Sequence, residues 1–211
     1  MCIRDSDKIC HMAMPYQIPG ATAVGITFDN GIVLGAEKRV SYGTHLVSRS
    51  GKKVFKVTDK VGAAAAGMIA DMNILMREVS AHAKITELET KQSLPPNSVA
   101  KFMGVIMYQQ KWFPMMAQII LAGVENDKPA VYVLDPLGSV IPDEYATVGT
   151  GAELAIGVVE SEYKKNMTEQ EAIDLVTKSI RSAINRDSAS GDGIDLLIVT
   201  KEEIREQSVN T

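Results

Sequence analysis

Cysteine is nearly missing from this chain. This and the other features that the sequence lacks each argue against a class of protein. Both cysteines, Cys2 and Cys10, lie in the first ten of 211 residues, so the rest of the chain has no disulfide or metal framework built on cysteine. That usage is typical of a reducing, intracellular compartment. The longest apolar runs, residues 61–68 and 117–124, fall well short of the roughly 20 residues needed to span a membrane. We therefore expect a cytoplasmic protein with no membrane partner.

Charge of one sign is also scarce. The net charge is −4, from 22 Lys and Arg against 26 Asp and Glu, which gives no indication of nucleic acid binding. The histidines, His11, His45 and His82, lack the spacing of metal ligands, and no glycine-rich phosphate loop is present. We therefore expect no metal and no cofactor. The 45% apolar and 23% charged residues are ordinary for one globular domain.

The first 20 residues differ in character from the rest of the chain. They mix charge, Cys, Met and Pro without periodicity, and they lack the apolar central stretch of a secretory signal. We interpret residues 1–20 as a propeptide ending at Gly20, or as a cloning scar with Met12 or Met14 as the true start. Residues 21–211 are then a single domain.

Alternating apolar residues from Thr22, followed by the turn signal at residues 29–31, predict a β-hairpin. We expect a three-residue loop with its glycine in the left-handed conformation. In that register Phe28 pairs with Ile32, Ala23 with Glu37, and Ala21 with Arg39. Further strands are predicted at residues 32–36, 53–57, 61–66, 118–123, 130–134, 145–148 and 194–200.

Between the strands the apolar period changes to that of helices. A first helix carries the buried stripe Met72, Leu75, Met76, Val79 and Ala83, and a second starts at Asn97 or Ser98. A third begins after Gly151, and a fourth has the capping box Thr168 with Glu171. The methionines on these stripes are interpreted as core residues. Helix pairs that bracket antiparallel hairpins favour an α+β fold, a four-layer α-β-β-α sandwich of two antiparallel sheets.

Four stretches carry a resemblance that covers residues 20–200: GATAVGITFDNGIVLGAEKRVSYG, SGKKVFKV, YATVGTGAELAIGVVESEY and INRDSASGDGIDLLIVT. They resemble the β-type subunits of the archaeal 20S proteasome, a threonine peptidase family with the N-terminal-nucleophile hydrolase fold. The resemblance implies heptameric rings, with two β rings stacked between two α-type rings. It also implies α-type subunits and active β-type subunits as partners, unfolded proteins or peptides as substrates, and indirectly an ATPase regulator.

In such enzymes the first residue of the mature chain supplies a hydroxyl nucleophile, and its own α-amino group is the base. An α-amino group has an ordinary pKa of about 7.7–8.0, so it can accept a proton at neutral pH. A buried lysine favours the deprotonated hydroxyl, and a carboxylate holds the lysine in place. Active relatives read Gly-Thr-Thr-Thr-Val or close to it and are cut after the Gly.

The resemblance also implies which residues form the site. Carried over by position, they are Glu37 for the acidic residue, Arg39 for the arginine that follows it, Lys53 for the catalytic lysine, Thr150 for a residue that is usually Ser, and Asp187 with Ser190 for the pair that braces the terminal amine and the nucleophile. Ser41 and Gly67 align with positions that bind the backbone of the substrate peptide.

The nucleophile position itself is Ala21, whose methyl group can neither attack a carbonyl nor remove the leader. Thr22 is the alternative nucleophile. In the expected register Ala21 shares a face with Glu37, while Thr22 points to the opposite face. A start at Thr22 would also move the reacting atom by about 3.3 Å. Misplacement on that scale can cost about 10²-fold in rate.

We therefore predict a non-catalytic β-type subunit with a structural role in intracellular protein degradation. One alternative is an active threonine endopeptidase that starts at Thr22. Another is an active subunit's precursor inactivated by an engineered Thr→Ala change, but Ala23 favours a natural variant because a knockout does not need it. A stand-alone hydrolase is a third alternative. More simply, Lys53 could form a structural ion pair with Glu37, or lie with Lys52 on a solvated strand edge.

Overall fold

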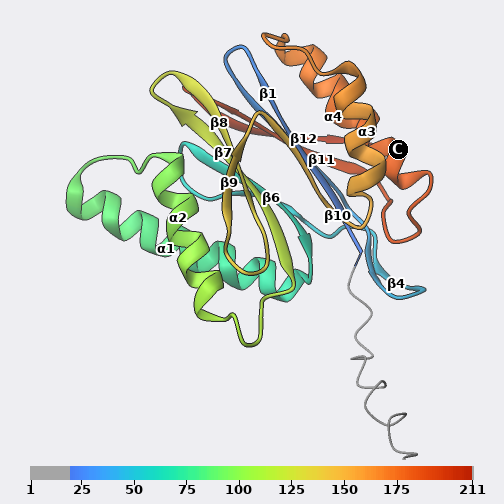
Figure 1. The fold of residues 1–211 in the computed structure, drawn as a ribbon, viewed down its shortest axis with the longest axis horizontal. Coiled ribbons are helices and arrows are strands. Elements are labelled where there is room, and N and C mark those ends of the chain that lie inside the picture. Colours follow the sequence, from blue (N-terminus) through green and yellow to red (C-terminus); the bar gives the residue numbers. More distant parts are fainter. Residues whose placement is uncertain (1–19, 211) are drawn as a thin grey trace, which may run out of the picture.

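The computed structural model describes residues 20–210, which form four layers (Figure 1). The strands are β1 (Thr22–Phe28), β2 (Gly31–Glu37), β3 (Val40–Tyr42), β4 (His45–Ser48), β5 (Val54–Lys56), β6 (Val61–Gly67), β7 (Ala117–Glu125), β8 (Lys128–Leu134), β9 (Val140–Asp143), β10 (Tyr145–Gly149), β11 (Ile194–Thr200) and β12 (Ile204–Val209). The helices are α1 (Ile69–Thr90), α2 (Pro96–Gln109), α3 (Ala152–Glu162) and α4 (Glu169–Ile184). The leader predicted from the sequence, which includes Cys2, Cys10, His11, Met12 and Met14, falls on residues outside the described range.

The strands form two five-stranded sheets and one small hairpin. The first sheet has the order β10-β1-β2-β11-β12 and the second has the order β5-β6-β7-β8-β9, while β3 pairs only with β4. The paired strands are antiparallel throughout. Helices α1 and α2 lie outside the second sheet, and α3 and α4 lie outside the first (Figure 1). The predicted four-layer α-β-β-α sandwich is confirmed.

Three apolar cores hold the layers together. Between the sheets, small side chains such as Ala23 and Ala64 pack with Leu34 and Ile120. The helical stripe that includes Met72 belongs to the core under α1 and α2, which confirms that the methionines are core residues. The third core joins α3 and α4 to the outer face of β1, β2 and β11. Because side chains alternate along a strand, consecutive residues of β1 contribute to different cores.

The fourth helix confirms its predicted start. The Thr168 hydroxyl accepts a hydrogen bond from the Glu171 N–H, and the Glu171 carboxylate accepts one from the Thr168 N–H. Val176 and Ile180 of this helix pack in the core against β1, β2 and β11. The end of α4 therefore delivers the turn at residues 187–190 to the first sheet.

The predicted register of the first hairpin is wrong by one residue. Phe28 pairs with Gly31 rather than Ile32, and Ala23 pairs with Ala36 rather than Glu37, so the loop holds only two residues. Gly31 is not left-handed. It is a glycine because a Cβ there would collide with the Val199 carbonyl oxygen and lie 2.9 Å from the Phe28 ring. Close packing, not turn geometry, explains this glycine.

That shift changes which residues face each other. One position before the Ala23–Ala36 pair, Thr22 lies across from Glu37, so the expected pairing of Ala21 with Arg39 and the shared face of Ala21 and Glu37 are also wrong. Thr22 still points away from Ala21, because neighbouring residues of a strand alternate. Ala21 packs between the two sheets, whereas Val24, two residues after Thr22, packs under α3 and α4.

The predictions missed β3, β4, β9 and β12. These strands are short or largely exposed, so they lack the apolar alternation that marks a half-buried strand. Helix α2 begins at Pro96, one residue before the expected range, since proline is well suited to the first turn of a helix. His45 and His82 are exposed. None of the helices described within residues 20–210 is long and apolar enough to cross a membrane.

Candidate active site

Ala21 lies immediately before β1 and is held at both of its backbone polar groups by Thr150. Its N–H donates to the Thr150 hydroxyl over 3.3 Å, and its carbonyl oxygen accepts from the Thr150 N–H over 2.8 Å. Ala21 is only 1% exposed, and it belongs to the apolar core between the sheets. The residue that the resemblance places at the nucleophile position is therefore held by two backbone hydrogen bonds, but it presents a methyl group.

Lys53 and Glu37 form a buried ion pair at the end of β2. The Lys53 ammonium donates to Glu37 Oε1 and, over 2.6 Å, to the Arg39 carbonyl oxygen. Glu37 Oε2 accepts from the Arg39 N–H at 2.6 Å and from the Gly191 N–H at 3.1 Å. Lys53 is 1% exposed, so it does not lie on a solvated strand edge, whereas Lys52 is exposed.

Burial dominates the electrostatics of this pair. Removal from water raises the pKa of the Glu37 carboxyl, although the Lys53 charge and hydrogen bonds to Glu37 oppose that shift. Burial likewise lowers the pKa of the Lys53 ammonium, against the attraction of Glu37. A lysine with a lowered pKa releases its proton more readily than an exposed one. That property suits the activation of a neighbouring hydroxyl.

Thr22 is fully buried, and both of its polar donors are engaged. Its N–H lies 3.4 Å from Glu37 Oε1, and its hydroxyl lies 2.8 Å from the hydroxyl of Ser190. A Cβ added to Gly151 would collide with Thr22 Oγ1, so the hydroxyl points toward the start of α3. Thr22 is thus tied into the layer of α3 and α4 and away from the space between the sheets.

The Asp187 carboxylate accepts hydrogen bonds from the hydroxyl groups of Thr150 and Ser190. Its Oδ2 accepts from the Thr150 hydroxyl at 2.6 Å and from the Ser190 hydroxyl at 2.8 Å. Its Oδ1 accepts from the Ala189 N–H at 3.0 Å, so Asp187 also helps to organise its own turn. One carboxylate therefore connects the turn after α4, the loop after β10 and the start of β1.

Arg39 supports the same turn from the other side. Its Nε donates to Asp192 Oδ2 over 2.7 Å, and its Nη1 donates to the Ser188 carbonyl oxygen over 2.9 Å. The hydrogen bond from Arg39 lowers the pKa of the Asp192 carboxyl. The guanidinium lies against Gly191, where a Cβ would collide with it. Sequence reasoning identified Arg39 but missed Asp192 and Gly191, and the acidic residue within SGDGID was the available signal.

Ser41 and Gly67 stand apart from this hydrogen-bond network. Ser41 is 4% exposed, and within residues 20–210 its hydroxyl has no hydrogen-bond partner. Gly67 has a φ of +130°, and a Cβ there would collide with the Met116 carbonyl oxygen. Gly67 lines a cavity of about 460 Å³ together with Ala66, Pro114, Met115, Met116, Ala117, Gln118, Pro136, Gly149 and Thr150.

Gln118 lies beside the candidate site, and the sequence analysis missed it. Its side-chain Oε1 accepts from the Gly149 N–H over 2.8 Å and so supports the loop that carries Thr150. Gly149 has a φ of +99°, and any Cβ there would collide with the Ala21 carbonyl oxygen. The glycine in the GTG stretch indicated that two backbone segments approach closely here. No local sequence pattern identifies Gln118 of β7 as the residue that binds Gly149.

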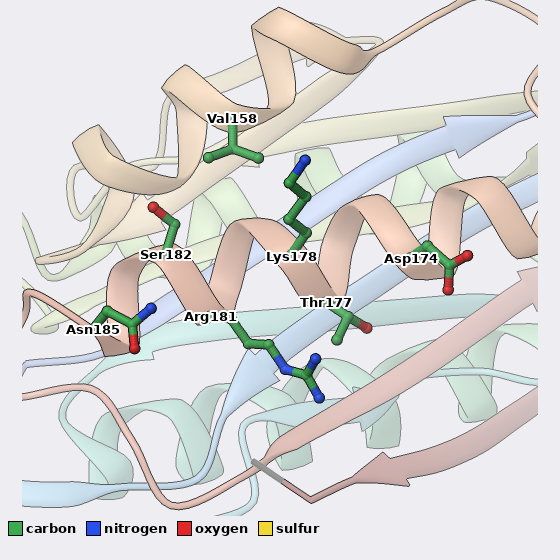
Figure 2. Close-up of a pocket in the computed structure, with 7 residues that line it drawn as sticks. All are labelled: Val158, Asp174, Thr177, Lys178, Arg181, Ser182 and Asn185. Atoms are coloured by element: carbon green, nitrogen blue, oxygen red, sulfur yellow. The ribbon is translucent and has the colours of Figure 1, made fainter.

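A separate cavity of about 490 Å³ lies on the outer surface of α3 and α4 (Figure 2). In Figure 2, Lys178 and Ser182 point from α4 toward Val158 of α3, while Thr177 and Arg181 point to the other side of the helix. The cavity is lined by Val158, Asp174, Thr177, Lys178, Arg181, Ser182 and Asn185. None of these is a residue of the candidate site. Within the described part of the chain, no group of three or more His, Cys, Asp or Glu is placed to hold a metal ion.

Comparisons with known proteins agree with this fold. The family model described as "Proteasome subunit" matches residues 19–199. The chain is 55% identical to "Proteasome subunit beta 1" of Nitrosopumilus maritimus over 92% of its own length and 97% of that protein. It is 52% identical to the subunit of the same name from Cenarchaeum symbiosum, over 90% and 97%. It is 46% identical to "Proteasome subunit beta 2" of Thermofilum pendens, over 90% and 93%.

These matches cover almost the whole described domain. The chain therefore belongs to the proteasome subunit family, and it is a β subunit of the archaeal type. The family resemblance read from the sequence is confirmed.

Proposed function

We propose that this chain is a non-catalytic β-type subunit of the 20S proteasome core particle. The observation that carries the proposal is the methyl group of Ala21, which is fixed by Thr150 where a nucleophile belongs. Lys53, Glu37, Asp187 and Ser190 belong to one connected network of hydrogen bonds, which reaches this position through Thr22 and Thr150. A methyl group cannot attack a carbonyl, so this network has no group to activate.

The burial of Thr22 argues against the rival threonine peptidase. A mature start at Thr22 would require a free amine there, but its N–H lies against Glu37 and its hydroxyl is bonded to Ser190. The side chain is also fully buried on the side of α3 and α4. A substrate carbonyl could reach this hydroxyl only if the start of β1 were rebuilt.

The surroundings of the two alanines support a natural variant over an engineered one. Ala21 and Ala23 are both buried in the core between the sheets, beside Ala36 and Ala66. Ala23 is 0% exposed, and its methyl group packs among the apolar side chains of this layer. Alanine at position 23 thus fits the packing and serves no purpose in a designed knockout.

The proposed role is structural. We infer that residues 21–211 form the β-type domain, which joins α-type subunits and active β-type subunits in stacked heptameric rings in the cytoplasm. Obligate interfaces of that kind typically bury about 2,000 Å² or more. There the chain would line the chamber in which unfolded proteins are degraded, with an ATPase regulator acting through the α rings. Residues 1–20 would be its leader, Ser41 and Gly67 would mark the former substrate path, and no cofactor is needed.

Reconstitution tests this role. The chain is produced with an α-type subunit, either alone or together with an active β-type subunit, and the assemblies are assayed with a fluorogenic peptide. We expect turnover only when the active partner is present, with both β-type chains in one particle by mass spectrometry. Turnover by this chain alone that is lost on Thr22→Ala would overturn the proposal and favour the start at Thr22.

A further inference from the structure

Thr22 carries a buried hydroxyl to which the proposed function assigns no role. Its oxygen lies 2.8 Å from Ser190 Oγ, and both residues are fully buried. Burying two hydroxyl groups costs free energy unless each one donates its proton to an acceptor. Because each hydroxyl has only one proton, its available acceptors fix the direction of each hydrogen bond.

The protons along this chain of groups all point toward Asp187. Ser190 has one hydroxyl proton and gives it to Asp187 Oδ2 at 2.8 Å, so Thr22 must be the donor in the Thr22–Ser190 contact. Thr150 gives its proton to the same oxygen at 2.6 Å, in preference to the Ala21 carbonyl at 3.3 Å. Its lone pair then accepts the Ala21 N–H.

One carboxylate oxygen thus links the side chain of Thr22 to the backbone nitrogen of the preceding residue. The link runs from Thr22 through Ser190 to Asp187, and from Asp187 through Thr150 to the nitrogen of Ala21. The two ends belong to neighbouring residues of one strand, so the link closes a ring around the start of β1. Such a ring fixes the nitrogen against both the turn after α4 and the loop after β10.

We propose that Thr22 is a positioning residue for the nitrogen of residue 21. This proposal rests on the proposed function, in which residue 21 is the nucleophile position and its amine the base. Thr22 does not touch the reacting atoms, because its side chain lies on the other face of the strand. It acts through Ser190 and Asp187, whose hydrogen bonds connect its hydroxyl to Thr150 and so to that nitrogen.

Two variants of Thr22 separate the hydroxyl from the packing. Thr22→Val keeps the shape and removes the donor, whereas Thr22→Ser keeps the donor and removes a methyl group. Both are made in an Ala21→Thr chain assembled with α-type subunits, and turnover is counted per site titrated with a threonine-directed covalent inhibitor. We expect Thr22→Val to lower kcat about tenfold with little change in KM, through misplacement of the base. Thr22→Ser should retain most of kcat.

Counting turnover per titrated site removes losses caused only by poor folding or assembly. Equally low kcat in the Val and Ser variants would show that packing matters rather than the donor, and equally high kcat would show that neither does. Either result would overturn the positioning role. Failure of the proposed function is a different result, namely turnover by the unaltered Ala21 chain.

A second readout needs no catalysis. In the unaltered chain, assembled with α-type subunits, hydrogen exchange followed by mass spectrometry reports on the Ala21 amide that donates to Thr150. We expect Thr22→Val to speed exchange in the peptide around residue 21 about tenfold, and Thr22→Ser to leave it near the parent rate. Unchanged exchange in the Val variant would overturn the proposal even if Ala21→Thr were inactive.

Discussion

The carbonyl oxygen of Ala21 accepts a hydrogen bond from the Thr150 N–H over 2.8 Å, while the Ala21 N–H lies 3.3 Å from the Thr150 hydroxyl. Two successive groups of the backbone are thus held by a single residue that follows β10, the edge strand paired with β1. Gly149 makes this approach possible, because a side chain there would collide with the Ala21 carbonyl. Both of these hydrogen bonds involve the backbone of residue 21, so under the proposed function the side chain there is what decides whether chemistry occurs.

Restoring a hydroxyl should therefore restore activity. We expect Ala21→Thr to remove the leader and to raise peptide turnover by on the order of 10³-fold or more, since loss of a nucleophile costs at least that much. Turnover by purified assemblies and intact mass of the chain measure the two effects. Ala21→Val, which has the shape of threonine without its oxygen, is the control and should remain inactive. An inactive Ala21→Thr chain with normal assembly would show that the rest of the site is not intact.

The ion pair between Lys53 and Glu37 should be a large determinant of stability. Lys53→Met leaves the Glu37 carboxylate buried without its partner, and we expect a loss of about 3–5 kcal/mol in the free energy of unfolding. Chemical denaturation of the purified chain measures the loss. The double variant Lys53→Met with Glu37→Gln should recover part of it, because no uncompensated charge remains. A single variant as stable as the parent would contradict the buried pair.

Gly67 and Gly157 form a matched pair for testing backbone strain. Gly67→Ala places a Cβ against the Met116 carbonyl at a φ of +130°, so we expect destabilisation by about 1–3 kcal/mol. Gly157 lies within α3, and a Cβ there meets nothing within 4 Å. Gly157→Ala should therefore stabilise the chain by about 0.5–1 kcal/mol. Thermal or denaturant unfolding compares them, and shifts of the same sign would contradict the geometry at Gly67.

Stability in acid should depend on Arg39. Its hydrogen bond lowers the folded-state pKa of Asp192 below the ordinary value of 3.8, so this carboxylate stabilises the fold above that value. The contribution is lost as pH falls through the lowered pKa. Arg39→Gln removes it, and the midpoint of acid unfolding, followed by circular dichroism, should move to higher pH. Lys52→Gln, which breaks an exposed pair with Glu206, should leave the midpoint unchanged. Equal shifts in both variants would refute the assignment to Asp192.

Much of the fold could be predicted because periodicity reflects burial. The stripe through Met72 on α1 and the capping box at Thr168 are local signals, and both are confirmed. The register of the first hairpin was not predictable from its turn signal, since Gly31 is required by its contact with Val199, which is distant in sequence. Strand β12 was missed because its exposed polar residues give no apolar pattern.

The candidate site was predicted by resemblance rather than by local physics. Nothing in the spacing of Thr150 and Asp187 says that their side chains meet, and the structure brings them to 2.6 Å through the ends of β10 and α4. Gln118 was missed because its bond to Gly149 joins two distant strands. The place of Thr22 across from Glu37 depended on a register that sequence alone gave wrongly.

The most direct test of the central claim is whether this polypeptide carries a nucleophile. Assemblies that contain the unaltered chain are incubated with a threonine-directed covalent inhibitor, and the intact mass of each subunit is measured. We predict an adduct on an active β-type partner and on the Ala21→Thr chain, and an unchanged mass for the unaltered chain. An adduct on the unaltered chain would contradict the account, because some other hydroxyl would then be serving as the nucleophile.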